Sequence, residues 1–246
     1  MNDSLIVPVI LVLNDEYWLP YALQATKGFF SRYVIYDVGS TDKTPDIIDW
    51  FKQTNPNVEF FHRRLDNTPH PNIQGIFRNS MIAEAGTDYF LILDGDEIYT
   101  HDSFVDLHAN VGLLELEYPK LYGIVPRVEV CENLDQAYGT DLTLPHHRIY
   151  HRHAIFYGSH PGEIPVYTQK PKNEMRFDGP ICYHFHNTER SSKEAEVPKR
   201  MKRKSQKTYH RGETKPFDLF EKLPMLKTRI ENFPVNPVLE RMWDKL

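Results

Sequence analysis

The segment from Tyr89 to Glu97 constrains the fold more than any other part of the chain. Five apolar residues, Tyr89 to Leu93, run directly into Asp94-Gly95-Asp96-Glu97. A continuous apolar run is typical of a strand that is buried on both faces. Open α/β sheets place their ligand sites at the carboxyl ends of such strands. The segment therefore predicts an α/β sheet with an acidic site at its edge.

The spacing of the two aspartates suggests a shared ligand. In extended backbone, side chains two residues apart leave on the same side, so Asp94 and Asp96 would converge. Two carboxylates at a strand end suit a divalent cation that also binds a phosphate. Taken alone, however, Asp-x-Asp is more often only a polar turn, so the interpretation depends on the neighbouring motifs.

Residues 33–37 form a second apolar run that stops at an aspartate, Asp37, and enters a turn rich in Gly, Ser, Thr and Asp. Thr44 is the expected N-cap of the helix that follows, with Pro45 at its first position. The first apolar run, residues 5–13, ends in Asn14-Asp15-Glu16. This run, too, ends in polar side chains.

Strands and helices are expected to alternate as far as about residue 117, which predicts a mostly parallel sheet flanked by helices. The expected strands are 5–13, 33–37, 58–62 and 89–94, and the expected helices are 18–30, 44–52, 73–85 and 103–115. From residue 120, short strand-like pieces follow: 121–131, 147–151, 154–157 and 181–185. A helical basic stretch is expected over 192–211, and a helical tail broken by prolines over 215–246.

Composition is consistent with one large globular domain or a domain with an appendage. The chain has 246 residues, 40% of them hydrophobic, and a net charge of −5, which gives no general attraction to nucleic acid. Two cysteines provide no disulfide framework, so a reducing, cytoplasmic location is expected. We see neither a signal peptide nor an apolar run long enough to span a membrane.

The motifs, in this order, resemble the family 2 glycosyltransferases of the GT-A fold. The matching residues are Asn14-Asp15-Glu16, Asp37 to Thr44, Arg78-Asn79 and Asp94-Gly95-Asp96. The pattern departs from the family where Asp15 separates Asn14 from Glu16 and where Val38 replaces a second aspartate. The resemblance implies a GT-A domain over 1–190, with a nucleotide-sugar half (1–117) and an acceptor half (118–190). A basic helical extension would then occupy 191–246.

The resemblance implies a metal-dependent, inverting transfer of a sugar from a nucleotide-diphosphate donor, with UDP favoured, to an acceptor hydroxyl. Asp94 and Asp96 would bind Mn²⁺ or Mg²⁺ and the ribose, and Arg78 would pair with the pyrophosphate. The full set of expected donor-binding residues is Asn14, Glu16, Asp37, Ser40, Asp42, Arg78, Asp94 and Gly95. For Arg78, an exposed arginine with a salt-bridge partner is an equally good interpretation.

Inversion requires a general base in the second half of the chain. Glu163, in a Gly/Pro loop, is the first candidate, with Asp141, Glu129 and Glu97 as rivals and a solvated turn as the plain alternative. His184 and His186 share one face of an expected strand with Cys182 and are candidate additional metal ligands. His146 and His147 would point to opposite faces, so they are interpreted as structural or acceptor-lining.

The stretch from Arg190 to Arg211 is rich in Lys and Arg and is interpreted first as a solvated helix face. It could instead contact the donor diphosphate, an anionic acceptor or the surface of a membrane, in which case the protein would be peripheral. The acceptor could be a saccharide, a lipid-linked group or a protein. Two alternative functions stay open: a sugar nucleotidyltransferase, and a non-catalytic nucleotide- or carbohydrate-binding module.

Overall fold

The computed structural model describes residues 5–66, 72–112, 122–138, 144–158, 164–166, 174–177, 182–186, 188 and 214–246. Within these ranges no helix is both long and apolar enough to cross a membrane. The strands are β1 (Ile6–Val12), β2 (Arg32–Asp37), β3 (Glu59–Arg64), β4 (Tyr89–Leu93), β5 (Glu97–Tyr99), β6 (Tyr122–Val130), β7 (Gln136–Tyr138), β8 (Leu144–His151), β9 (Ile155–Tyr157), β10 (Ile164–Val166), β11 (Glu174–Arg176), β12 (Cys182–His184) and β13 (Thr214–Pro216). The helices are α1 (Leu19–Ala25), α2 (Thr44–Thr54), α3 (Ile73–Ala85), α4 (His101–Val111), α7 (Leu219–Lys222), the 3₁₀ helix η3 (Pro224–Lys227) and α8 (Pro237–Trp243).

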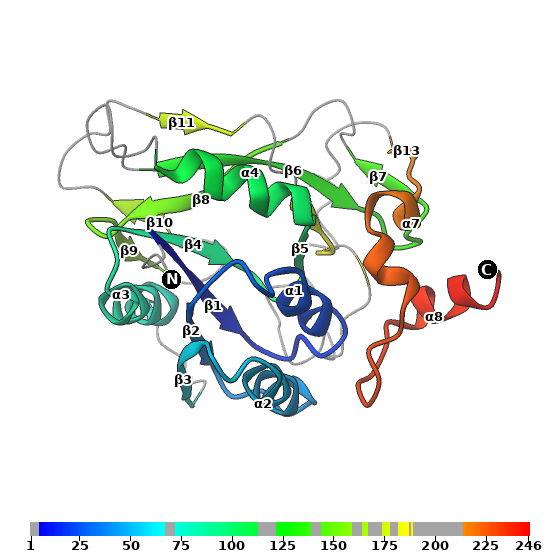
Figure 1. Cartoon of the computed structure of the whole chain (residues 1–246), viewed down its shortest axis with the longest axis horizontal. Coiled ribbons are helices and arrows are strands. Elements are labelled where there is room, and N and C mark those ends of the chain that lie inside the picture. The colour runs from blue at the N-terminus through cyan, green and yellow to red at the C-terminus, as the bar shows by residue number, and fades with distance from the viewer. Residues whose placement is uncertain are drawn as a thin grey trace.

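One large mixed sheet forms the centre of the molecule (Figure 1). Its main path runs β13-β7-β6-β8-β4-β1-β2-β3, and the part from β4 to β3 is parallel throughout. In register, Val12 lies beside Asp37, and Ile10 lies beside Leu93. The three strand ends that carry the predicted acidic motifs are therefore neighbours at one edge of the sheet. The predicted fold class, a mixed and mostly parallel sheet flanked by helices, is confirmed.

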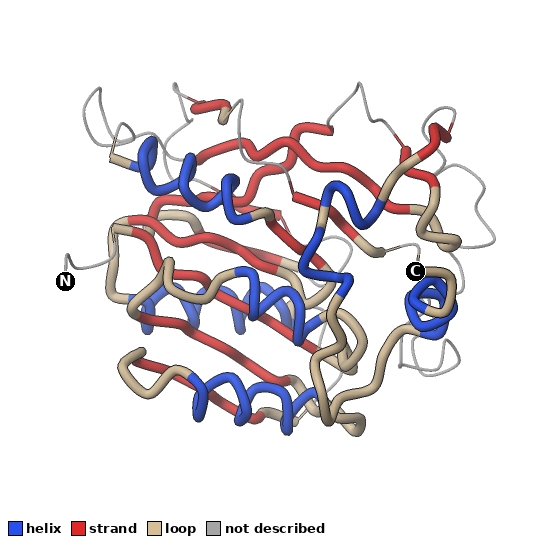
Figure 2. The backbone as a smooth tube through the Cα atoms, turned by 45° about the vertical axis from the view of Figure 1, so that its right-hand side comes forward, coloured by secondary structure: helices blue, strands red, loops and turns tan. Residues whose placement is uncertain are grey.

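Apolar side chains alternate between the two faces of β1 and bury a core on each. Ile6, Ile10 and Val12 face the side covered by α1, α2 and α4. Val7 and Val9 face the opposite side, which α3 covers. This two-sided burial explains why the strand is apolar at nearly every position. Figure 2 shows the layered arrangement of strands and helices.

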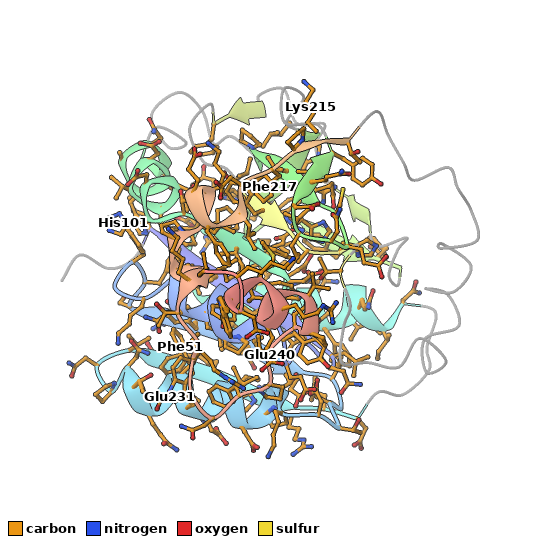
Figure 3. The ribbon with its side chains drawn as sticks, turned by 90° about the vertical axis from the view of Figure 1, so that its right-hand side faces the viewer. Phe51, His101, Lys215, Phe217, Glu231 and Glu240 are labelled. Atoms are coloured by element: carbon orange, nitrogen blue, oxygen red, sulfur yellow. The ribbon has the colours of Figure 1, made fainter. Side chains whose placement is uncertain are left out.

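The C-terminal segment covers the end of the sheet at which the parallel strands finish (Figure 1). Its apolar residues, including Phe217, Leu226 and Leu239, form a third core with Trp18 and Ile98. Strand β13 pairs with β7. In Figure 3, which faces this side, the elements that carry Phe217 and Glu240 lie in front of the sheet. The segment thus packs against the first helix and the second half of the sheet.

Several predicted boundaries are wrong for identifiable reasons. The first helix ends at Ala25 instead of 30, because the Thr26 hydroxyl bonds the Leu23 carbonyl and Gly28 adopts a φ of 86°. The N-cap position of α2 is Lys43, not Thr44, whose hydroxyl accepts the Asp15 N–H instead. The fourth helix begins at His101, two residues earlier than predicted, after the side-chain cap of Thr100.

The tail differs from the predicted broken helix. It opens with a strand, β13, and Pro224 and Pro237 begin helices rather than interrupt them. Proline suits a first helical turn, where its missing N–H costs no hydrogen bond. Strand β5 was not predicted, because its three residues are too short to show a pattern. The predicted basic helix over 192–211 lies outside the described residues.

Candidate active site

The turn after β1 is joined to the turn after β2 by side-chain hydrogen bonds. Asn14, with a φ of 53°, accepts the Thr41 N–H at 2.8 Å through its side-chain oxygen. Its own N–H donates to the Ser40 hydroxyl at 2.9 Å. A left-handed backbone is tolerated by Asn better than by most residues, which explains the residue type here. The structure therefore brings Asn14 and Ser40 together as parts of one loop pair.

Asp42 and Glu16 strengthen the same junction. The two oxygens of Asp42 accept N–H groups of Thr44 and Glu16 at 2.9 and 3.2 Å. Glu16 in turn accepts the Lys43 N–H at 2.9 Å. Burial raises the pKa of Glu16, and the hydrogen bond from Lys43 opposes that effect. These carboxylates bind backbone groups at the start of α2.

Asp37 lies at the end of β2 and is fully buried. Its Oδ1 accepts the Ser40 N–H at 2.8 Å. Its Oδ2 has no hydrogen-bond partner among the described residues, although Arg64 Nε approaches to 3.9 Å. A buried carboxylate oxygen without a hydrogen bond is costly, and such groups recur at functional sites.

Asp94 and Asp96 do not project together from extended backbone, so that prediction is wrong. The strand ends at Leu93, and the Glu97 N–H bonds the Asp94 carbonyl at 3.1 Å, which closes a turn. Gly95 packs against the turn after β1: an added Cβ would lie 2.9 Å from Asp15 Cβ. The turn sends the two carboxylates into different surroundings.

Asp94 is bound by two buried arginines. Arg78 Nη2 lies 3.1 Å from Asp94 Oδ1, and Arg148 Nη2 lies 2.8 Å from Asp94 Oδ2. Arg148 also contacts the fully buried Glu97. Burial raises the pKa of Glu97, against the effect of Arg148. Although burial acts to lower it, Asp94 and Glu97 raise the pKa of Arg148.

This network changes the interpretation of two predicted residues and adds a third. Arg78 is buried within α3, so it is not the exposed arginine of the plain alternative. Glu97, a candidate base, is enclosed beside Arg148. Arg148 itself was not predicted as a site residue; the available signal was the Arg-x-aromatic pattern of Arg148-Ile149-Tyr150.

Asp96, His184 and His186 form the metal-type cluster. One ligand atom of each lies within 4.8 Å of the others. Strand β12 brings the histidines there by pairing with β5, which directly follows the Asp96 turn, and the Phe185 N–H bonds the Asp96 carbonyl at 2.9 Å. His184 Nε2 lies 3.5 Å from Asp96 Oδ2. Three of the four predicted metal ligands are therefore close together, while Asp94 is bound by arginines instead.

Of the other predicted residues, some are described by the structure and some lie outside the described residues. Asn79 lies in α3, where its side chain bonds both the N–H and the carbonyl of Phe156 in β9. Glu129, named as a rival base, contacts His184 Nδ1 at 2.8 Å. Glu163 and Asp141 lie outside the described residues.

Comparisons with known proteins bear on the family and the fold. Residues 9–111 match the family model "Glycosyl transferase family 2". No curated protein matches the chain in sequence. Among solved structures, Staphylococcus aureus TarS residues 1–349 in complex with UDP-GlcNAc aligns with 98% of this chain and 70% of that chain, at a TM-score of 0.50 and 12% identity.

Two further TarS structures align over a smaller share. The structure of TarS 1–349 covers 60% of this chain and 47% of that chain, with a TM-score of 0.44 and 15% identity. A longer TarS structure covers 52% and 21%, with a TM-score of 0.38 and 17% identity. The chain thus spans less than half of the length of either of these two. Residues 9–111 therefore resemble family 2 glycosyltransferases, and the chain shares the GT-A fold of TarS 1–349.

Proposed function

We propose that the protein transfers a sugar from a nucleoside-diphosphate donor to an acceptor hydroxyl, with a divalent metal ion at Asp96, His184 and His186. The observation that carries the proposal is this cluster, whose Asp96 follows the carboxyl end of β4 within residues 9–111, the part of the chain that matches family 2. Ligand sites of open α/β sheets lie at that edge.

The donor set indicates which ion to expect. One carboxylate and two imidazoles suit Mn²⁺ and similar transition ions, whereas Mg²⁺ prefers oxygen ligands throughout. When bound, the ion would neutralise charge that develops on the departing diphosphate. We therefore expect Mn²⁺ to support donor binding and sugar transfer better than Mg²⁺.

Asp94 and Asp37 are proposed as contacts of the nucleoside. Asp94 is the more accessible of the two, with one third of its side chain exposed, and Arg78 and Arg148 fix its orientation. It suits the hydroxyls of a ribose. The buried Oδ2 of Asp37 suits an N–H donor on a base. Asn14, Glu16, Ser40 and Asp42 would act by shaping the loops around the nucleotide rather than by direct contact.

Uridine is the first nucleoside to test, because TarS, which has the same fold, was solved in complex with UDP-GlcNAc. From the resemblance to family 2, the transfer is proposed to invert the anomeric carbon of the sugar. The general base that deprotonates the acceptor hydroxyl would come from the second half of the chain, with Glu163 as the first candidate and Asp141 as the second. A nucleotidyltransferase is disfavoured, because no Gly-rich loop bearing Arg or Lys follows the first strand.

Thermal unfolding with a panel of nucleoside diphosphates, each with and without Mn²⁺, tests the proposal. A ligand at about 100 times its dissociation constant adds roughly 2.7 kcal/mol of stability. We expect metal-dependent stabilisation by one nucleotide in the wild type and none in Asp96→Asn. The matched control is Asp102→Asn, since Asp102 is an exposed aspartate on α4, and it should respond like the wild type.

Donor turnover then separates the remaining alternatives. Slow hydrolysis of one nucleotide sugar, dependent on Mn²⁺, is expected of a transferase without its acceptor. Binding without any turnover would point to the non-catalytic module. No stabilisation by any nucleotide would contradict the proposal as a whole.

A further inference from the structure

We propose that Glu129 is a positioning residue for His184, which it orients so that Nε2 faces the metal position beside Asp96. The inference rests on the proposed function, because it assigns a role within the same metal site. It concerns a residue that does not itself belong to the ligand cluster.

Strand pairing places the two residues side by side. Strand β12 runs parallel to β6, and His184 is the register neighbour of Glu129. Glu129 Oε2 lies 2.8 Å from His184 Nδ1. Both side chains are largely buried, with 11% of His184 and 13% of Glu129 exposed. A hydrogen bond shielded from water in this way constrains the imidazole ring more than an exposed one would.

The contact decides which ring nitrogen carries hydrogen. An ionised carboxylate only accepts hydrogen bonds, so Nδ1 must be the donor. In neutral His184 the lone pair then resides on Nε2, the nitrogen that lies 3.5 Å from Asp96 Oδ2. A carboxylate behind a ligating histidine fixes its tautomer and orientation and makes it a stronger ligand.

Arg127 keeps Glu129 ionised and in place. Its Nη2 lies 2.6 Å from Glu129 Oε1, so the two carboxylate oxygens have separate partners. Two residues apart on β6, Arg127 and Glu129 lie on one face of the strand.

The position of His184 also affects the second histidine. The rings of His184 and His186 stack with centroids 5.2 Å apart and an interplanar angle of 21°. Phe185, which separates the two histidines in sequence, stacks on Trp18 with ring centroids 4.1 Å apart, and Trp18 Nε1 donates a hydrogen bond to the Thr188 hydroxyl at 2.8 Å. With the backbone anchored in this way, the hydrogen bond that His184 Nδ1 donates to Glu129 selects the ring orientation of His184.

Mn²⁺ affinity, measured with the metal alone, tests the role. We expect Glu129→Gln to bind Mn²⁺ about 10- to 100-fold more weakly than the wild type, the usual effect of losing such a partner. Glu84→Gln is the matched control, because Glu84 is a well-covered carboxylate on α3 that is paired with Arg63 and does not belong to the cluster. Its Mn²⁺ affinity should equal that of the wild type.

A spectroscopic measurement needs no stable variant of Glu129. In metal-free wild type with ¹⁵N-labelled histidine, at a pH at which the His184 ring is neutral, His184 should show hydrogen on Nδ1 and a lone pair on Nε2. Its signals are assigned by their absence from His184→Gln. Hydrogen on Nε2 would overturn the proposal, even if Glu129→Gln failed to fold.

The outcomes separate the two proposals. Equal Mn²⁺ affinity in the wild type and a folded Glu129→Gln would refute the positioning role and leave the proposed function intact. Failure of the wild type to bind Mn²⁺ would overturn the metal site of the proposed function, and the positioning role with it. Weaker binding in Glu129→Gln alone, together with the Nδ1–H tautomer, would establish the role.

Discussion

Arg148, on β8, forms an ion pair with Asp94, at the end of β4, with a nitrogen–oxygen distance of 2.8 Å across 54 positions of sequence. The partner strands β4 and β8 are antiparallel, with Leu91 beside Ile149, so the pairing carries Arg148 toward the acidic turn. Asp94 is thereby bound to cations of the protein, while Asp96, two residues later, faces two histidines. Two carboxylates that look equivalent in sequence thus have different surroundings.

This difference predicts different effects of two matched substitutions on metal binding. Asp96→Asn should weaken Mn²⁺ binding by about a hundredfold or more, since it removes the charge of a direct ligand. Asp94→Asn should weaken it by less than about tenfold, because both Asp94 oxygens contact arginines. Isothermal titration of Mn²⁺ into each folded variant measures both effects. Equal losses would mean that Asp94 also ligates the ion.

Removing Arg148 should strongly destabilise the protein. Arg148→Met leaves the fully buried Glu97 without its cation, and breaking a buried pair costs about 3–5 kcal/mol. Arg152→Met removes a neighbouring arginine whose pair with Asp88 is more than half exposed, and exposed pairs contribute about 0–1 kcal/mol. Urea unfolding of both variants gives the comparison. A small effect of Arg148→Met would show that Glu97 is protonated or rehydrated at little cost.

Gly95 is required by the close approach of two turns. In Gly95→Ala the new methyl group would lie 2.9–3.0 Å from Asp15 side-chain atoms, so one turn must shift, at a cost of about 1–3 kcal/mol. Mn²⁺ affinity should also fall, because Asp96 is the next residue. Gly112→Ala is the control, since nothing lies within 4 Å of an added Cβ there. Unchanged metal affinity and stability in Gly95→Ala would contradict the packing argument.

Asn79 connects α3 to β9 and should contribute to stability. Asn79→Ala leaves the N–H and the carbonyl of Phe156 without that partner, which costs about 1–3 kcal/mol. Hydrogen exchange at the Phe156 amide should become faster. Asn110→Ala, which removes a single bond to Asp106 within α4, is the control and should cost less. Unchanged exchange at Phe156 would show that another group replaces the asparagine.

His108 should make stability depend on pH. Its ring packs against Phe29 and Phe30, and burial lowers its pKa from the ordinary 6.5. The unfolded chain therefore takes up the proton first as pH falls. The free energy of unfolding has its full value above 6.5 and decreases as pH falls through the lowered pKa.

Replacing His108 by Phe tests this dependence. His108→Phe keeps an aromatic ring in the packing and removes the titrating group, so its stability should decrease less than that of the wild type as pH falls. Urea unfolding at a series of pH values measures the difference. Parallel stability curves for the two proteins would exclude His108 as a source of the pH dependence.

Local patterns were sufficient for the first half of the fold. The apolar runs over 5–13, 33–37 and 89–94 predicted parallel strands, which the structure has within one residue at each end, and the helix over 73–85 was predicted with its observed bounds. Because buried parallel strands need apolar residues on both faces, their sequence identifies them without further context. The acidic turns at their ends followed from the same reasoning.

Contacts between distant segments required the tertiary structure. Only the pairing of strands brings Arg148 into contact with Asp94, Glu129 into contact with His184, and β12 beside β5. No local pattern in the sequence indicates which strands become neighbours. The sequence by itself determined the sheet, its acidic edge and the residue types of a metal site. Tertiary structure decided which of those carboxylates meets the histidines and which meets the arginines, because a side chain's partners depend on strand order and register.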